Sequence, residues 1–299
     1  MSDLRPTPEC RLPKGEGTQR RFTEQEMRAF ERDAKIGLVA TVDGGGLPHL
    51  TLITSIQARD PTHLMYGQFC EGLSKTHVKE NARTGFLIMS PEKELWRGKA
   101  LWTHEAKSGE DYETYNKKPM FRYNSYFGIH TVHYLDLVTC GGKEKADVPR
   151  IALGSLITML SRHLARTHPA RSRQPERILK PWAEAHIAKP GTLKFLSYVG
   201  GDGYPVIVPV VPCQTVDSRR LVFAPTVYRR ELAAVPTGTR IAVFALNLQM
   251  ESVLVRGVFA GYRRYVGPPV GIIDIDWVYN SMPPKQGTIY PPNPALSSA

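Results

Sequence analysis

The sequence is poor in cysteine, and its cysteines are far apart. Four occur in 299 residues, at positions 10, 70, 140 and 213, and no two of them form a C-x-x-C pair. A disulfide framework and a structural zinc site both require clustered cysteines, so this spacing argues against both. We therefore expect reduced thiols and a cytoplasmic location.

Long apolar runs are also absent. The first 30 residues are polar and charged, without the apolar segment that is typical of a secretory signal. No apolar run approaches the ~18 residues that a membrane-spanning helix needs. The sequence therefore predicts a soluble protein without a membrane partner.

Three familiar catalytic signatures are missing as well: a nucleophile elbow, a Walker phosphate loop and a pair of catalytic carboxylates. An enzyme with this sequence would have to take its chemistry from a bound cofactor. His130 and His133 lie three residues apart, as two metal ligands on a helix can. Their surroundings are more typical of a strand, in which they would face opposite sides, and we expect no metal site.

Positive charge is present in excess, with a formal net charge of +11. Part of it lies between Arg162 and Lys180, where six basic residues stand against one acid, Glu176. Proteins that bind single-stranded nucleic acid alternate basic and aromatic residues, and no aromatic residue occurs here before Trp182. Nucleic acid is therefore an unexpected partner. We interpret the run as a solvated basic connector, with a site for an anionic cofactor or partner as the alternative.

The sequence repeats itself. Residues 36–56 and 193–213 both contain an apolar run, a glycine-rich turn, a proline and a second apolar run. A repeat of this kind indicates a duplicated fold. Three matches share an offset of 157 residues: Gly46 with Gly203, Pro48 with Pro205, and Leu64 with Leu221.

The repeat continues with a small change of offset. Arg97 in "LWRGKALW" matches Arg256 in "LVRGVFAG" at 159 residues, which we interpret as a loop insertion. Each copy then contains a strand, a glycine turn, two strands, a short helix or turn, and two more strands. Glycine supplies the positive φ of tight hairpin turns, and short strands at this spacing favour a barrel or sandwich.

Helical patterns flank the two copies. Thr23 and Glu26 form a capping box at the start of one helix, and residues 147–167 carry an apolar stripe at helical spacing. These patterns divide the chain into three parts. We expect a first barrel with its N-terminal helix at 22–145, a helical basic connector at 146–190, and a second barrel with an extended C-terminal tail at 191–299.

Four short motifs follow one another in the first copy: the turn 43–48 (DGGGLP), the turn 74–76 (SKT), Asn81, and 96–98 (WRG). In this order they resemble the FMN-binding split-barrel proteins, the superfamily of pyridoxamine 5'-phosphate oxidase. The resemblance covers about residues 30–140, and residues 190–282 more weakly. It implies a mainly β fold with flanking helices, in which two tandem split β-barrels pack as an intrachain pseudo-dimer.

The resemblance also implies a cofactor site. In that family FMN lies in the groove between two barrels, and here one chain would form its own groove, as a monomer or within a further homodimer. Residues 51–54 would follow the isoalloxazine edge, 74–76 would bind the phosphate, and 96–99 would approach the ring. The residues implied are Thr51, Leu52, Ile53, Thr54, Ser74, Lys75, Thr76, Trp96, Arg97 and Lys99.

The second copy has diverged at the phosphate turn. Tyr228, Arg229 and Arg230 replace the Ser-Lys-Thr set, so we expect one FMN site per chain. Together with Arg256, these residues form a possible second anion site. For Ser74 there is a simpler alternative, because serine is a common N-cap of a helix.

The function implied by the resemblance is that of an FMN-binding oxidoreductase. It would transfer a hydride or electrons through flavin N5, to or from a small-molecule substrate or an electron-transfer partner. The alternatives are a deazaflavin in place of FMN, or a non-enzymatic flavin or haem carrier or sensor. In the haem case His130 or His133 could be the axial ligand. The ending GTIYPPNPALSSA lacks the Arg-rich motif of the oxidase itself, so we do not expect that specific activity.

Overall fold

The computed structural model describes residues 18–118, 128–167, 177–280 and 287–291. The first half contains α1 (Glu24–Glu31), β1 (Ile36–Val42), β2 (Pro48–Leu52), β3 (Gln57–Asp60), β4 (His63–Gln68), α2 (Leu73–Glu80), β5 (Arg83–Met89), β6 (Glu94–Ala106), α3 (Glu110–Lys117), β7 (Thr131–Cys140) and β8 (Glu144–Lys145). The second half contains α5 (Val148–Arg166), α6 (Pro181–Ala188), β9 (Leu193–Val199), β10 (Pro205–Pro209), β11 (Cys213–Thr215), β12 (Arg220–Phe223), α7 (Arg229–Ala233), β13 (Arg240–Leu246), β14 (Ser252–Arg263), β15 (Val270–Asn280) and β16 (Gly287–Tyr290).

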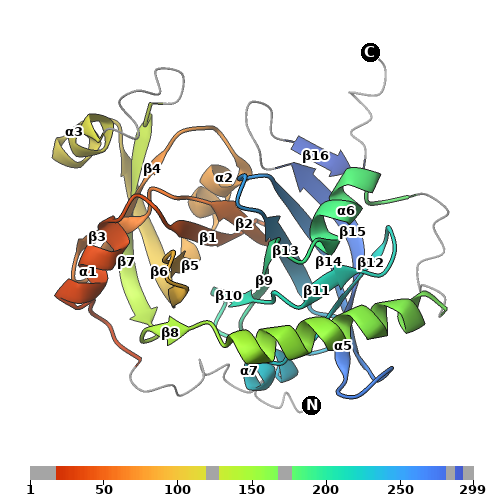
Figure 1. Cartoon of the computed structure of the whole chain (residues 1–299). Coiled ribbons are helices and arrows are strands. Elements are labelled where there is room, and N and C mark those ends of the chain that lie inside the picture. The colour runs from red at the N-terminus through yellow and green to blue at the C-terminus, as the bar shows by residue number, and fades with distance from the viewer. Residues whose placement is uncertain (1–17, 119–127, 168–176, 281–286, 292–299) are drawn as a thin grey trace, which may run out of the picture.

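The two halves have the same topology. Each forms an eight-stranded antiparallel sheet, and the two sheets lie side by side (Figure 1). The order is β2-β1-β5-β6-β7-β4-β3 in the first, with β8 beside β6. It is β10-β9-β13-β14-β15-β12-β11 in the second, with β16 beside β15. The predicted fold, two tandem split barrels, is confirmed.

Local sequence explains how the elements begin and turn. The capping box of α1 is present, since Thr23 and Glu26 each accept the other's backbone N–H. Gly46 and Gly203 have φ of 77° and 80°, which the hairpins β1–β2 and β9–β10 require. The predicted turns and this cap are therefore where the sequence places them.

The offset between the copies stays constant through the hairpin that follows. Lys93, in the β5–β6 turn, has φ of 64°, and Met250, in the β13–β14 turn, has φ of 65°. A β-bulge follows Lys99 in β6 and Arg256 in β14. All these positions differ by 157 residues, so neither turn contains an insertion relative to the other.

The match between Arg97 and Arg256 predicted from the sequence is therefore wrong. Lys99 pairs with Gly85, and Arg256 pairs with Ala242, which places Arg256 opposite Lys99 in the repeat. The shared letters Arg-Gly suggested a different alignment, but the length of the turn determines strand register. The counterpart of Arg97 is a leucine of β14.

The barrels pack against each other through an apolar interface. Strands β1, β2 and β5 of the first barrel contact β9, β10 and β13 of the second, which confirms the predicted intrachain pseudo-dimer. The backbones approach closely, since a Cβ added at Gly85 would lie 2.2 Å from the carbonyl oxygen of Pro205. The buried cluster there includes Leu38, Ala40, Leu50 and Leu87 from one barrel and Phe195, Ile207, Ala242 and Phe244 from the other.

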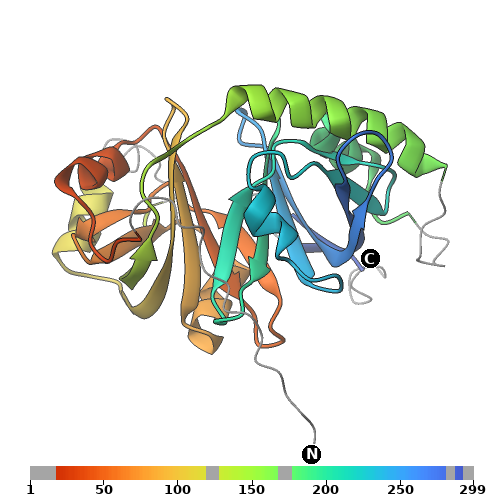
Figure 2. The ribbon, with the colours of Figure 1, turned by 90° about the horizontal axis from the view of Figure 1, so that it is seen from below.

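Helix α5 connects the barrels and runs along one side of the second (Figure 2). A Cβ at Gly154 would lie 2.4 Å from Thr226 Oγ1, so the helix approaches the barrel through small residues. Apart from Ile157, which is buried, most of its large apolar side chains face outward: Gly154, Ser161 and Ala165 are buried, whereas Leu153, Leu156 and Leu160 are 42–55 % exposed. Among the described helices, none is long and apolar enough to cross a membrane.

Parts of three predictions lie outside the described residues. These are Cys10, the arginines at 171 and 173 of the basic run, and most of the C-terminal tail. Within that tail, the described residues 287–291 include β16, which pairs with β15.

Candidate cofactor site

The start of α2 is the predicted phosphate turn. The helix begins after Gly72, which provides no side-chain cap, and Ser74, Lys75 and Thr76 lie in its first turn. Ser74 is therefore not the N-cap, and the capping alternative is wrong. A helix leaves its first N–H groups without intrahelical acceptors and carries partial positive charge at this end, so the position favours an anion.

A polar cavity adjoins this helix start. Its volume is about 460 Å³, and it brings together residues from β4, α2 and the start of β7. Two lysines and a histidine line it, which makes an anionic group a suitable occupant. The lining residues are Gln68, Phe69, Cys70, Glu71, Lys75, Lys107, His130 and Thr131.

Lys75 has a partner that an anion could displace. Its ammonium group lies 2.8 Å from the carboxylate of Glu71, whose side chain is 81 % exposed. Ion pairs as exposed as this contribute little to stability, typically below about 1 kcal/mol. A phosphate could therefore replace Glu71 as the partner of Lys75 with little loss of stability.

The predicted ring-binding segment 51–54 lies beside the same helix. Leu52 of β2 and Leu73 of α2 pack against the interface cluster, as does Trp277 of β15. The hydroxyl of Tyr279, also in β15, hydrogen-bonds the backbone of Leu73. The end of β2 and the start of α2 thus contact each other and pack against the second barrel.

The third predicted segment, residues 96–99 of β6, contributes to the barrel core and to the interface between the barrels. Successive strand residues face opposite sides. Trp96 points into the first barrel, where it is 2 % exposed and meets Phe30 edge-on at 5.3 Å. Arg97 and Lys99 point the other way, and Lys99 forms an ion pair with Asp202 of the second barrel. None of the three lines the polar cavity described above.

Arg97 belongs to a buried ion network between the barrels. It donates to Glu231 at 3.1 Å, to Glu144 at 3.1 Å and to the carbonyl of Ile207 at 2.9 Å. Its guanidinium group lies 4.6 Å from the ring centre of Tyr228. Burial by itself lowers the pKa of Arg97, but the two carboxylates raise it above its usual value, so the group stays charged. With all three nitrogens engaged, Arg97 is not available to a flavin.

The second barrel lacks an equivalent phosphate turn. At the constant offset, Glu231 takes the place of Ser74, and its side chain is 5 % exposed. Tyr228 donates to Glu144 at 2.9 Å, while Arg229 and Arg230 are exposed. A carboxylate and Leu232 therefore take the places of Ser74 and Lys75, and Glu144 of β8 adds a second carboxylate nearby, so a phosphate is disfavoured here.

Arg256, the fourth residue of the predicted second anion site, belongs to a different cluster. It donates to Asp43 at 3.0 Å, and its guanidinium group lies 4.4 Å from the ring centre of Trp277. His49 and His77 complete the cluster, with ring centres 5.1 Å apart. Burial, and then the charge of Arg256, lower the pKa of both histidines, so both are neutral at pH 7. No sequence motif marked this cluster.

His130 and His133, the two histidines considered as haem or metal ligands, differ in exposure. His133 is buried, and both of its ring nitrogens are engaged, Nδ1 by Trp102 at 3.1 Å and Nε2 by Gln68 at 2.7 Å. His130 is exposed and lines the polar cavity. Across the residues that the structure describes, no group of three His, Cys, Asp or Glu side chains could hold a metal ion.

Comparisons with known proteins show a likeness of fold. No family model and no curated protein matches the sequence. One similar structure is a Lactobacillus delbrueckii protein proposed to be a pyridoxamine 5'-phosphate oxidase (18 % identity, 42 % of this chain, 96 % of that chain, TM-score 0.33). Another is an FMN-binding protein from Syntrophomonas wolfei (13 %, 41 %, 86 %, 0.35). A third is a heme binding protein from Mycobacterium smegmatis (12 %, 62 %, 87 %, 0.28).

At this level of identity and TM-score, the similar structures say nothing about the site, which is therefore argued from the residues of this chain. The architecture follows from the matching strand orders and from the constant offset between the copies. The chain is a tandem pair of split barrels, and in fold it resembles the FMN-binding, pyridoxamine 5'-phosphate oxidase-like proteins.

Proposed function

We propose that the chain binds FMN, one molecule per chain, and works as a flavin-dependent oxidoreductase. One observation carries the proposal. The first turn of α2, whose N-cap Gly72 has no side chain to bond it, contains Ser74 and Lys75, and Lys75 lines a polar cavity together with Lys107 and His130. A hydroxyl, cationic side chains and helix N–H groups are the donors that a phosphate monoester needs.

The neighbouring residues fit the remainder of the cofactor. Residues 51–54, which are the end of β2 and the start of the turn after it, would offer backbone groups and two threonine hydroxyls to the polar rim of the ring. Trp277 and Tyr279 of β15 close the interface on the other side and would exclude water from it. When bound, FMN would supply hydride or electron transfer, since the sequence contains no nucleophile elbow, Walker loop or pair of catalytic carboxylates.

The test compares FMN with riboflavin, which lacks the phosphate. We expect Lys75→Ala with Ser74→Ala to weaken FMN binding about tenfold and to leave riboflavin binding unchanged. The matched control is Lys79→Ala, in the last turn of the same helix, where the side chain pairs with Glu105 at 3.0 Å. Equal losses for both ligands, or none for FMN, would refute the phosphate site.

Haem binding is the second candidate, because His130 is an exposed histidine beside the cavity. The visible spectrum of the purified protein separates the cases. Two flavin bands that bleach with dithionite support FMN, whereas a Soret band that His130→Ala abolishes supports haem. Turnover with a small-molecule donor, rather than redox cycling alone, distinguishes an enzyme from an electron carrier.

The cytoplasm is the proposed location, and a monomer with an internal pseudo-dimer is the simplest assembly. A further homodimer remains an alternative. Light scattering on the purified protein measures this state directly.

A further inference from the structure

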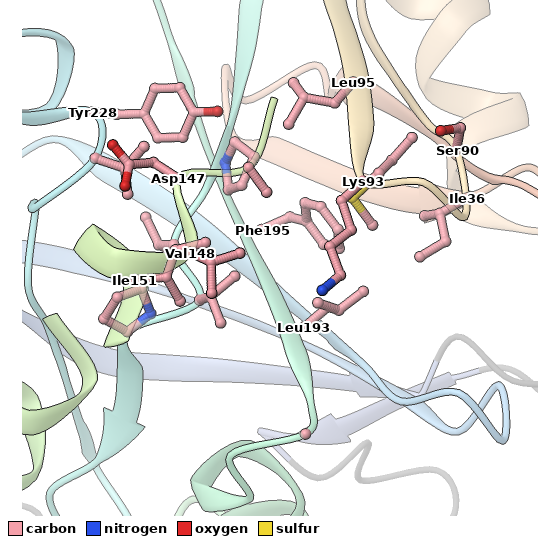
Figure 3. Close-up of a pocket in the computed structure, with 18 of the residues that line it drawn as sticks. Ile36, Ser90, Lys93, Leu95, Asp147, Val148, Ile151, Leu193, Phe195 and Tyr228 are labelled. Carbon is pink, nitrogen blue, oxygen red and sulfur yellow. The ribbon is translucent and has the colours of Figure 1, made fainter. Parts of the chain in front are cut away.

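A cavity of about 630 Å³ lies between the barrels, against the start of α5 (Figure 3). It is distinct from the polar cavity at α2. Its walls come from the β5–β6 turn, from β9 and β10, and from α5. Leu95, Val148, Ile151, Leu193 and Phe195 are among its mainly apolar lining residues. Both the volume and the apolar lining are typical of small-molecule pockets, which span roughly 300–1,000 Å³.

Most of the polar groups in this lining are already bonded within the protein. Burial also lowers the pKa of Lys35 to about 8, so this lysine is still mostly protonated at pH 7. The bonded groups are the Asp147 carboxylate with the Arg150 amide, the Tyr228 hydroxyl with Glu144, and the Lys35 ammonium with the Arg32 carbonyl.

Two lining groups are exceptions, the buried Ser90 hydroxyl and the side chain of Lys93, an exposed residue. The ammonium group of Lys93 has no hydrogen bond or ion pair to any residue that the structure describes. Its backbone is fixed, because its N–H donates to Ser90 at 3.0 Å and its carbonyl accepts from Ala146 at 3.1 Å. In Figure 3 the side chain points toward Leu193, away from Asp147 and Tyr228. One side of the cavity therefore carries a cationic side chain without a protein partner, and most of the remaining lining is apolar.

The opposite side of the cavity is unsuited to a phosphate. Tyr228 lines this side and donates a hydrogen bond to Glu144. Behind it, the carboxylates of Glu144 and of the buried Glu231 already balance the charge of Arg97. An occupant must therefore place an apolar part there and any negative charge near Lys93. A flavin phosphate at this end of the cavity would meet like charge.

We propose that this cavity binds an amphiphile with one carboxylate, in which the hydrocarbon body fills the apolar part and the carboxylate meets Lys93. The proposed site lies between the barrels, beside the part of the second barrel that lacks the phosphate turn of the first. This site is separate from the proposed FMN site, so either can exist without the other.

The experiment fills the cavity from α5 and removes its charge. Calorimetry measures the binding of dodecanoate and of the neutral dodecanol to the full chain. Ile151→Trp places an indole in the cavity, and we expect it to weaken both ligands at least tenfold. Leu156→Trp makes a similar change on the outer face of the same helix, where Leu156 is 50 % exposed, and should leave both affinities unchanged.

Lys93→Gln tests the charge separately. We expect dodecanoate to bind about three- to tenfold more weakly and dodecanol to bind as before. Saturating FMN should leave dodecanoate affinity unchanged. Binding that Ile151→Trp does not alter, equal effects of Lys93→Gln on both ligands, or competition by FMN would each overturn the proposal. Unchanged melting temperatures would show that the variants are folded.

Discussion

Lys99 of the first barrel and Arg256 of the second are counterparts, and each reaches an aspartate in the hairpin turn of the other barrel. Lys99 pairs with Asp202, and Arg256 pairs with Asp43. The cationic side chains are 6 % and 7 % exposed. The interface therefore keeps the approximate two-fold symmetry of a dimer, although one ion pair uses a lysine and the other an arginine. The two halves differ more at the phosphate turn, which the first barrel has and the second lacks.

The first prediction concerns Arg97 and its buried acids. Arg97→Ala leaves Glu231 buried without a counter-charge, and we expect the free energy of unfolding to fall by about 3–5 kcal/mol. Urea titration followed by tryptophan fluorescence measures the change. Replacing both charges, Arg97→Met with Glu231→Met, should recover most of the loss, because the fully buried carboxylate is then removed, while Glu144 is 31 % exposed and keeps its hydrogen bond from Tyr228.

A surface pair provides the control for that experiment. Lys143 lies 3.1 Å from Glu94, with side chains 43 % and 25 % exposed. Lys143→Ala should cost less than about 1 kcal/mol. If Arg97→Ala is as mild as this control, or if the double variant is no better than the single one, the network does not hold the barrels together.

The strands and turns could be predicted because their signals are local. Gly46 and Gly203 mark hairpins by their own backbone requirement, and short β-branched runs mark strands wherever they pack. The direction in which β6 side chains point could not be predicted. Both faces of this strand are buried, one in the barrel and one at the interface, so apolar alternation does not distinguish Trp96 from Arg97.

The candidate site was predictable only at α2, where Ser74 and Lys75 lie next to each other in the sequence. The cluster of His49, His77 and Arg256 depends on packing between barrels, and its members are up to 207 residues apart. The apolar cavity is assembled in the same way, from turns and strand ends that no spacing rule connects. Sequence similarity also misaligned Arg256, because register depends on the geometry of a turn.

The second prediction is a loss of stability in mild acid. Burial lowers the pKa of His133 to about 4, so the folded protein keeps this histidine neutral while the unfolded chain binds a proton below about pH 6.5. Stability is therefore complete above pH 6.5 and is lost as the pH falls toward 4. Between pH 7 and pH 5 this one group should remove about 2 kcal/mol from the free energy of unfolding.

A variant isolates the contribution of His133 from that of other groups. His133→Gln can still bond Trp102 and Gln68 but does not titrate, so its unfolding free energy should depend less on pH by that amount. His104→Gln, at an exposed histidine, should leave the wild-type dependence unchanged. Parallel pH profiles for wild type and His133→Gln would show that the buried imidazole is not the cause.

The third prediction tests how closely the barrels approach. Gly85→Ala would place a Cβ 2.2 Å from the backbone carbonyl of Pro205 in the second barrel. Because that neighbour is backbone, strands must shift to relieve the contact, at a cost of about 1–3 kcal/mol. Gly191→Ala, where nothing lies within 4 Å of the added carbon, should change stability by less than about 0.5 kcal/mol. Thermal unfolding of both variants measures the difference. Equal melting temperatures would mean that the interface can open to accept a methyl group, and that the packing of β5 on β10 is not what fixes the two barrels.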